Sequence, residues 1–280
     1  MTPFLALTGA LIVGSSDFIG GFLARRTSVY RVAFGEQVAS LAAFVVLAPM
    51  VPTARVTTTD LVGGVVAGLG VVIGLLALYI AFQLGPMSAL APIAAVVGAL
   101  VSAAAGVLEG DSVTVALAVG AVLALSGVVL VTQDRDAATS STNVSSRAVA
   151  MAILAGIAFA AFFVGLSRTS SDAGVWPLVA ARIAGVPVIG ALVWHHTRGF
   201  LVEREHRRLN IAGGLIGALA TVLTMIALQR GPVVQAVVLG ALYPFSTVVL
   251  ARSILHESLR PVQWVGVASA LIGIPLIAIG

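Results

Sequence analysis

Long apolar stretches recur along this chain at intervals of roughly 25 to 30 residues, and this pattern limits the fold more than any other feature. Each stretch is close to the ~20 residues that cross ~30 Å of hydrocarbon as an α-helix. Strands of a membrane barrel would instead alternate polar and apolar residues. Of the whole sequence, 59% is apolar and only 9% is charged, which is typical of a lipid-facing protein. The sequence therefore predicts an all-α membrane protein.

Ten transmembrane helices are expected from the positions of these stretches. They cover Pro3–Phe22, Val32–Val51, Leu61–Phe82, Met87–Leu108, Val113–Val131, Ala148–Ser167, Trp176–Trp194, Ile211–Gln229, Val233–Ile254 and Val262–Ile279. The arginines between them are distributed unevenly, with eleven at odd-numbered connections and three at even-numbered ones. Under the positive-inside rule this places the odd connections in the cytoplasm and both termini outside. We expect a multi-pass protein of the plasma membrane, in prokaryotes the inner membrane.

A polar segment divides the chain into two sets of five spans. Residues 133–147 (QDRDAATSSTNVSSR) read as a cytoplasmic linker between a first repeat, residues 1–132, and a second, residues 148–280. A shift of 146 residues superposes Gln83-Leu-Gly-Pro on Gln229-Arg-Gly-Pro, together with several glycines and alanines further on. Because each repeat has an odd number of spans, the second enters the membrane from the opposite side. The pattern predicts two inverted five-helix repeats, an architecture used for alternating access.

Several motifs of the second half resemble those of the EamA-type drug/metabolite transporters. They are Gln229-Arg-Gly-Pro232, Leu242-Tyr-Pro244, Leu255-His-Glu-Ser258 and Gln263-Trp-Val-Gly266. The resemblance implies a ten-helix fold in which spans one to four and six to nine surround a central cavity, with the fifth and tenth at the periphery. It also implies export of amino acids, other metabolites or drugs.

Three ionisable side chains lie within the predicted spans: Asp17, Glu36 and Arg182. A charge at a helix centre costs at least ~2.5 to 3.5 kcal/mol and usually marks a partner or a wet pathway. Glu36 and Arg182 are equivalent under the 146-residue shift, and a vertical separation of roughly 10 Å argues against direct pairing. We predict that they line opposite ends of the cavity and that Glu36 or Asp17 is a site of proton coupling. Alternatively, Asp17 caps a helix end or bonds Ser15 and Ser16 locally.

The simpler interpretation of Glu36 is that it pairs with Arg31 near the interface. Tyr79, Gln235 and Tyr243 form a second set of candidates, because an amide or phenol in hydrocarbon needs a hydrogen-bond partner that a substrate could supply. Bonds between helices are the alternative for these residues, and they are the preferred interpretation of Gln83 and Gln229, which lie near span ends.

Two prolines of equivalent helices are candidate bending points for gating. Pro92 lies in the fourth span and Pro244 in the ninth, and each frees a carbonyl and permits a kink. Gly64 with Gly68, and Gly70 with Gly74, instead predict close packing of the third span on a neighbour.

Other function classes lack the residues they need. The sequence has no cysteine, its four histidines lie in or beside connections, and it has neither a His-Glu-x-x-His nor a phosphate-binding loop. We therefore expect no enzyme activity, no metal site, no cofactor and no nucleic-acid partner. The prediction is a secondary transporter of a small organic solute in the lipid bilayer, with proton or counter-solute coupling as an option. A channel or a non-transporting membrane scaffold is the alternative.

Overall fold

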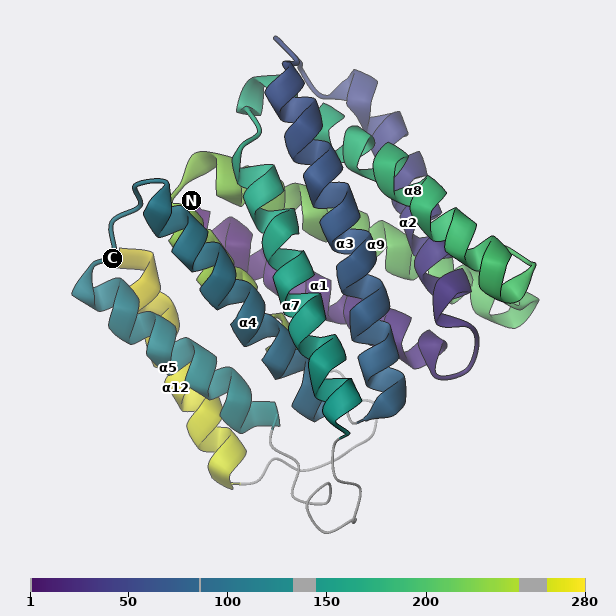
Figure 1. Cartoon of the computed structure of the whole chain (residues 1–280). Coiled ribbons are helices and arrows are strands. Elements are labelled where there is room, and N and C mark those ends of the chain that lie inside the picture. The colour runs from purple at the N-terminus through teal and green to yellow at the C-terminus, as the bar shows by residue number, and fades with distance from the viewer. Residues whose placement is uncertain (1, 86, 133–144, 247–260, 280) are drawn as a thin grey trace.

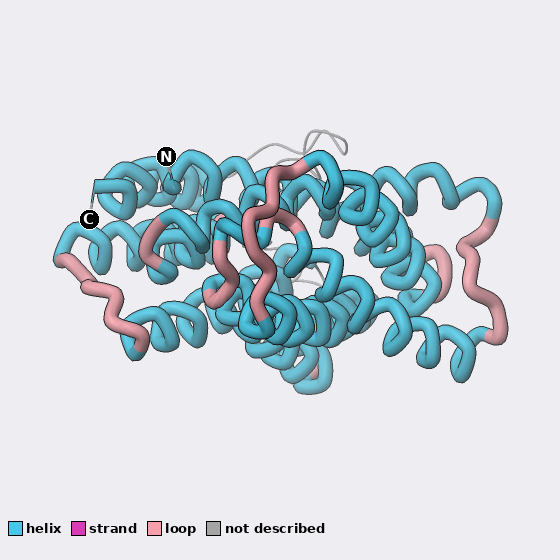
Figure 2. Tube along the Cα trace, turned by 90° about the horizontal axis from the view of Figure 1, so that it is seen from above, coloured by secondary structure: helices cyan, strands magenta, loops and turns pink. Residues whose placement is uncertain are grey.

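A computed structural model describes residues 2–85, 87–132, 145–246 and 261–279. Within these ranges the chain forms ten α-helices and two short 3-10 helices, Ala48–Met50 and Ser171–Ala173, without a strand (Figures 1 and 2). The α-helices are α1 (Thr2–Ala24), α2 (Val29–Leu47), α3 (Thr58–Leu84), α4 (Met87–Leu108), α5 (Val115–Thr132), α7 (Ser146–Ser167), α8 (Trp176–Thr197), α9 (Arg204–Arg230), α10 (Val233–Gly240) and α12 (Pro261–Ile279).

Seven described helices are long and apolar enough to cross a membrane: α1, α2, α3, α4, α7, α8 and α9. Their backbone hydrogen bonds are satisfied within each helix, as a lipid environment requires. Shorter apolar segments occupy Val115–Gly127 and Val233–Ser246. The predicted all-helical, multi-pass class is confirmed. The main boundary difference is α9, which begins seven residues before the apolar stretch and carries arginines in its first turns.

The helices pack in a pattern that alternates between the two halves of the chain. Helix α3 packs on α7 and α8, α1 packs on α9, α2 packs on α8 and α9, and α4 packs on α7 and α10. Helices α5 and α12 pack chiefly on each other, and Figure 1 shows them together at the flank farthest from α2 and α8. The eight other α-helices form the body of the protein.

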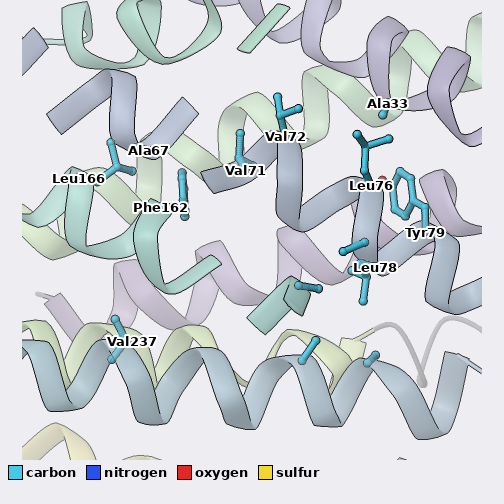
Figure 3. Close-up of a cluster of buried hydrophobic side chains, with 14 of the residues drawn as sticks. Ala33, Ala67, Val71, Val72, Leu76, Leu78, Tyr79, Phe162, Leu166 and Val237 are labelled. Carbon is cyan, nitrogen blue, oxygen red and sulfur yellow. The ribbon is translucent and has the colours of Figure 1, made fainter. Parts of the chain in front are cut away.

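Glycines bring α3 into close contact with two neighbours. A Cβ at Gly64 or Gly68 would collide with backbone carbonyls of α8, and one at Gly70 or Gly74 would collide with α7. The predicted close packing is confirmed, because small residues let helix backbones approach. Figure 3 shows the apolar core along α3, with Tyr79 buried beside apolar side chains of the same helix.

Hydrogen bonds at the ends of α3 and α9 are related by the same 146-residue shift that superposes the two halves of the sequence. Gln83 donates to the Ala24 carbonyl at 2.7 Å, and Gln229 donates to the Ser170 carbonyl at 3.2 Å. Both donor and acceptor are displaced by 146 residues between the two bonds, from 83 to 229 and from 24 to 170. The two glutamines thus tie helix ends together, as the preferred interpretation expected.

The ninth predicted span is interrupted close to Pro244, where we predicted a bend. Helix α10 ends at Gly240, and a turn at residues 241–242 precedes renewed helix from Tyr243 to Ser246. Pro244 explains the interruption, because it has no N–H to bond the Gly240 carbonyl and its ring crowds that carbonyl. In contrast, α4 continues through Pro92.

The polar segment between the halves lies mostly outside the described residues, which exclude 133–144. Helix α7 starts within the predicted linker, at Ser146, because the Ser145 hydroxyl accepts a hydrogen bond from the Ala148 N–H at 3.1 Å. This is a helix N-cap, which satisfies one of the unpaired donors of the first turn.

Candidate functional site

A cavity lies in the interior of the eight-helix body. With its open mouth it holds about 950 Å³ of empty space. Helices α1, α2, α3, α4, α7, α8, α9 and α10 all contribute to its wall, whereas no lining residue belongs to the described parts of α5 or α12. The wall is mostly apolar, and its charged side chains are Asp17, Glu36 and Arg182. The structure therefore brings together the three ionisable residues that the sequence singled out.

The acidic end of the cavity is built by α1, α2 and α3. Asp17 and Glu36 are buried, at 6% and 4% exposure, and Tyr79 is fully buried. The Tyr79 hydroxyl donates a hydrogen bond to Glu36 Oε2 at 2.9 Å. Glu36 Oε1 has no hydrogen-bond partner. Tyr79 thus holds one carboxylate oxygen in place, while the other is buried without a hydrogen-bond donor.

Two glycines make room for this carboxylate. A Cβ at Gly20 of α1 would overlap the Tyr79 hydroxyl and come within 2.8 Å of Glu36 Oε1. A Cβ at Gly213 of α9 would lie 3.1 Å from the same oxygen. Small residues at both positions allow the helices to close around Glu36 without displacing it.

The basic end is formed by Arg182 of α8, which is 3% exposed. Its Nε and Nη1 atoms have no hydrogen-bond partner. The guanidinium lies over the Phe44 ring of α2, with Cζ 5.3 Å from the ring centroid. Among the described residues no carboxylate forms an ion pair with it. A buried cation in this setting is stabilised by the aromatic face but lacks an anion.

The distance between Glu36 and Arg182 follows from residue separations along two helices, α2 and α3. Along α2, Phe44 lies eight residues beyond Glu36, or about 12 Å at 1.5 Å per residue. Along α3, Tyr79 bonds Glu36 and Gly68 packs on the Ala181 backbone next to Arg182. These α3 positions are eleven residues apart, or about 16 Å. Glu36 and Arg182 therefore face the cavity from separate levels.

The local alternatives for Glu36 and Asp17 are wrong. Arg31 forms an ion pair with Glu203 at 3.4 Å, so Glu36 does not pair with it. Ser15 donates to the Leu11 carbonyl and Ser16 to the Gly213 carbonyl, so neither hydroxyl donates to Asp17.

The other predicted residues take different places. Tyr243 lines the cavity, and its hydroxyl donates to the Ala91 carbonyl at 3.4 Å. Gln235 lies away from the cavity wall and donates to the Ile277 carbonyl of α12 at 2.7 Å. Pro92 and Pro244 are buried but do not line the cavity.

Sequence reasoning missed several wall residues. Gln37 is buried at 2% exposure, lines the cavity, and has an Oε1 atom without a partner. Its signal was present, because an amide inside an apolar span needs a partner just as Tyr79 does. Phe159, Phe162 and Phe163 of α7 also form the wall, but phenylalanines in a membrane helix carry no sequence signal that separates cavity from lipid.

No cluster of His, Asp and Glu that could hold a metal ion occurs among the described residues. The fold and the site define a multi-pass helical membrane protein with a charged internal cavity. Residues 146–279 of the chain match the model of the EamA-like transporter family. Its members are membrane transporters of the drug/metabolite type rather than enzymes.

Comparison with solved structures supports the same fold. A solved structure described as "Crystal structure of protein" superposes with a TM-score of 0.71 at 16% identity, covering 97% of each chain. The comparison with curated proteins gave no significant match.

Proposed function

We propose that the protein is a secondary transporter that moves a small organic solute across the plasma membrane, by export or exchange, through alternating access. The observation that carries this proposal is the cavity with its unpartnered charged atoms on Glu36 and Arg182. Burying an ionisable group in a membrane helix costs at least ~2.5 to 3.5 kcal/mol. Groups kept there without a protein partner are best explained by a solute that supplies one.

Alternating access would use an inverted repeat of residues 1–132 and 148–280, which the helix contacts support. The α1–α9 and α3–α7 contacts are counterparts under exchange of the two halves, as are α2–α9 with α3–α8 and α4–α7 with α1–α10. Ser269 of α12 donates to the Leu123 carbonyl of α5 at 2.7 Å, and these residues are themselves 146 apart. Equivalent residues that touch lie close to a twofold axis. A pseudo-twofold axis in the membrane plane lets one arrangement of helices serve both faces in turn.

Gating would use the helices that carry Pro92 and Pro244. The turn after Gly240 places an interrupted helix at the cavity wall, since Gly240 and Ala241 both line it. Breaks of this kind are common where transporters bind and release solute. Asp17 and Glu36 are the groups at which a proton would be exchanged for, or moved with, the solute.

The proposed orientation has both termini outside and residues 133–147 in the cytoplasm. The chain has no cysteine, so single cysteines report sidedness without background. A cysteine at exposed Ala54 should react with an impermeant maleimide in intact cells, whereas one at exposed Glu205 should react only after permeabilisation. The opposite pattern would reverse the orientation.

Flux of organic solutes into sealed liposomes containing the purified protein tests the proposed function. We expect uptake that saturates with solute concentration and is strongly reduced in Glu36→Gln and Arg182→Gln. Arg55→Gln is the control, because Arg55 is an exposed arginine outside the cavity. Flux that does not saturate would indicate a channel. Absence of flux for every solute of a broad panel would indicate a scaffold.

A further inference from the structure

We propose that the solute is an elongated zwitterion, whose ammonium lies at Glu36 and whose carboxylate lies at Arg182, with about 6 to 10 Å between the two groups. This inference rests on the proposed function, because it takes the cavity to be the solute site. It adds the chemical class of the solute and its length.

The carboxylate end follows from Arg182. A guanidinium keeps its positive charge at neutral pH and recognises carboxylates with its fork of N–H donors. Two of its donor atoms, Nε and Nη1, have no partner, and its described aromatic contact is the Phe44 ring. An anionic group entering the cavity would satisfy both its charge and its hydrogen bonds.

The ammonium end follows from three acceptors that line the cavity. Glu36 Oε1 and Gln37 Oε1 are buried without a partner, and the Asp17 carboxyl group lines the same cavity. An ammonium has three N–H donors and no acceptor. It therefore matches a site that offers several hydrogen-bond acceptors and a negative charge.

The cavity wall between Glu36 and Arg182 determines which chemical groups can form the middle of the solute. Val71, Leu75 and the phenylalanines at 159, 162 and 163 give it an apolar character. Ser40, Thr221 and Thr224 also line the cavity but are few beside this apolar surface. A solute with many hydroxyl groups would lose most of its hydrogen bonds to water there, which disfavours sugars. A chain of methylenes, or a short peptide with apolar side chains, suits this region.

The length of the solute follows from the distances along α2 and α3. Subtracting a hydrogen bond of about 3 Å at each end from about 12 to 16 Å leaves about 6 to 10 Å for the solute. The ammonium and carboxylate of an α-amino acid are only about 3 Å apart, so one molecule cannot reach both ends. An extended dipeptide or tripeptide spans about 7 to 10 Å, as does an ω-amino acid of six to eight carbons.

Binding to the purified full-length protein in detergent, measured by calorimetry, tests this proposal. The probes are glycine, 4-aminobutanoate, 6-aminohexanoate and 8-aminooctanoate, with hexylamine and hexanoate as single-charge controls. We expect 6-aminohexanoate or 8-aminooctanoate to bind at least about tenfold more tightly than glycine and than either control. Arg182→Gln should weaken 6-aminohexanoate binding by about 30-fold or more, with less than about threefold effect on hexylamine.

Glu36→Gln should show the reverse selectivity, weakening hexylamine and leaving hexanoate little changed, while Arg55→Gln should match the wild type. Equal affinity for 6-aminohexanoate and hexylamine, or tightest binding of glycine, would overturn the zwitterion. Saturable flux of a singly charged solute, with no preference for zwitterions, would overturn this inference and leave the transporter standing. Zwitterion selectivity in calorimetry without flux into liposomes would instead reject the proposed function and retain the ligand class.

Discussion

The Tyr79 hydroxyl is the only hydrogen-bond donor that the described residues aim at the Glu36 carboxylate, and Tyr79→Phe removes it with little change of shape. The bond is 2.9 Å long, and both side chains are buried. Because Glu36 Oε1 already lacks a partner, the variant leaves both oxygens without a donor. A hydrogen bond to a charged group contributes about 1.5 to 3 kcal/mol. We expect the free energy of unfolding to fall by that amount.

Equilibrium unfolding of the purified protein by denaturant measures this change as a shift in the midpoint at constant slope. Tyr30→Phe is the matched control, because it removes a phenol hydroxyl outside the cavity, where the ring stacks on His196. Its effect should stay within about 0.5 kcal/mol.

A double-mutant cycle separates the hydrogen bond from other effects. If Tyr79 acts through Glu36, Tyr79→Phe should cost much less in a Glu36→Gln background, with a coupling energy of about 0.5 to 3 kcal/mol. Strictly additive effects, or a Tyr79→Phe protein as stable as Tyr30→Phe, would refute the role assigned to this bond.

Three further perturbations test the packing around the site and the helix ends. Gly20→Ala should destabilise the protein by about 1 to 3 kcal/mol in denaturant unfolding, because the added methyl group overpacks the site. Gly190→Ala is the control and should be tolerated, since its Cβ would lie 3.4 Å from its nearest neighbour. Equal effects of the two substitutions would contradict the packing argument. Gln229→Leu breaks the hydrogen bonds from α9 to Thr169 and Ser170, which follow α7, and should lower the free energy of unfolding by about 0.5 to 1.5 kcal/mol in the same assay. An unchanged unfolding midpoint would show that these bonds do not stabilise the protein. Arg168→Gln removes the partly exposed ion pair with Glu109 and should change stability by at most about 1 kcal/mol, less at high salt, so a larger, salt-independent loss would argue for another role.

Part of the cavity could be predicted because charge is rare in this chain. Asp17, Glu36 and Arg182 stood out in apolar spans, since their burial demands a partner, and all three line the cavity. Gln235 shows the limit of that argument. A buried amide needs a partner, but the sequence does not say whether a solute or a backbone carbonyl supplies it, and here the Ile277 carbonyl does.

The break in the ninth span illustrates a second limit. Pro244 and Pro92 have the same chemistry, and both predicted a bend. Helix α4 nevertheless continues through Pro92, whereas α10 ends at Gly240, four residues before Pro244. Each proline removes one backbone hydrogen bond and crowds the preceding turn, so residue type alone does not say whether the helix continues or breaks there.

Residue type and spacing alone determined that the chain is helical, crosses the membrane several times and carries buried charge, because these properties depend on local hydropathy and helix geometry. Tertiary packing decided which faces of the helices meet. Glu36 and Tyr79 are 43 residues apart in sequence and become partners only where α2 and α3 pack on each other with Gly20 of α1 beside them. The hollow between Glu36 and Arg182 likewise exists only because eight helices close around it, and no local pattern encodes that volume.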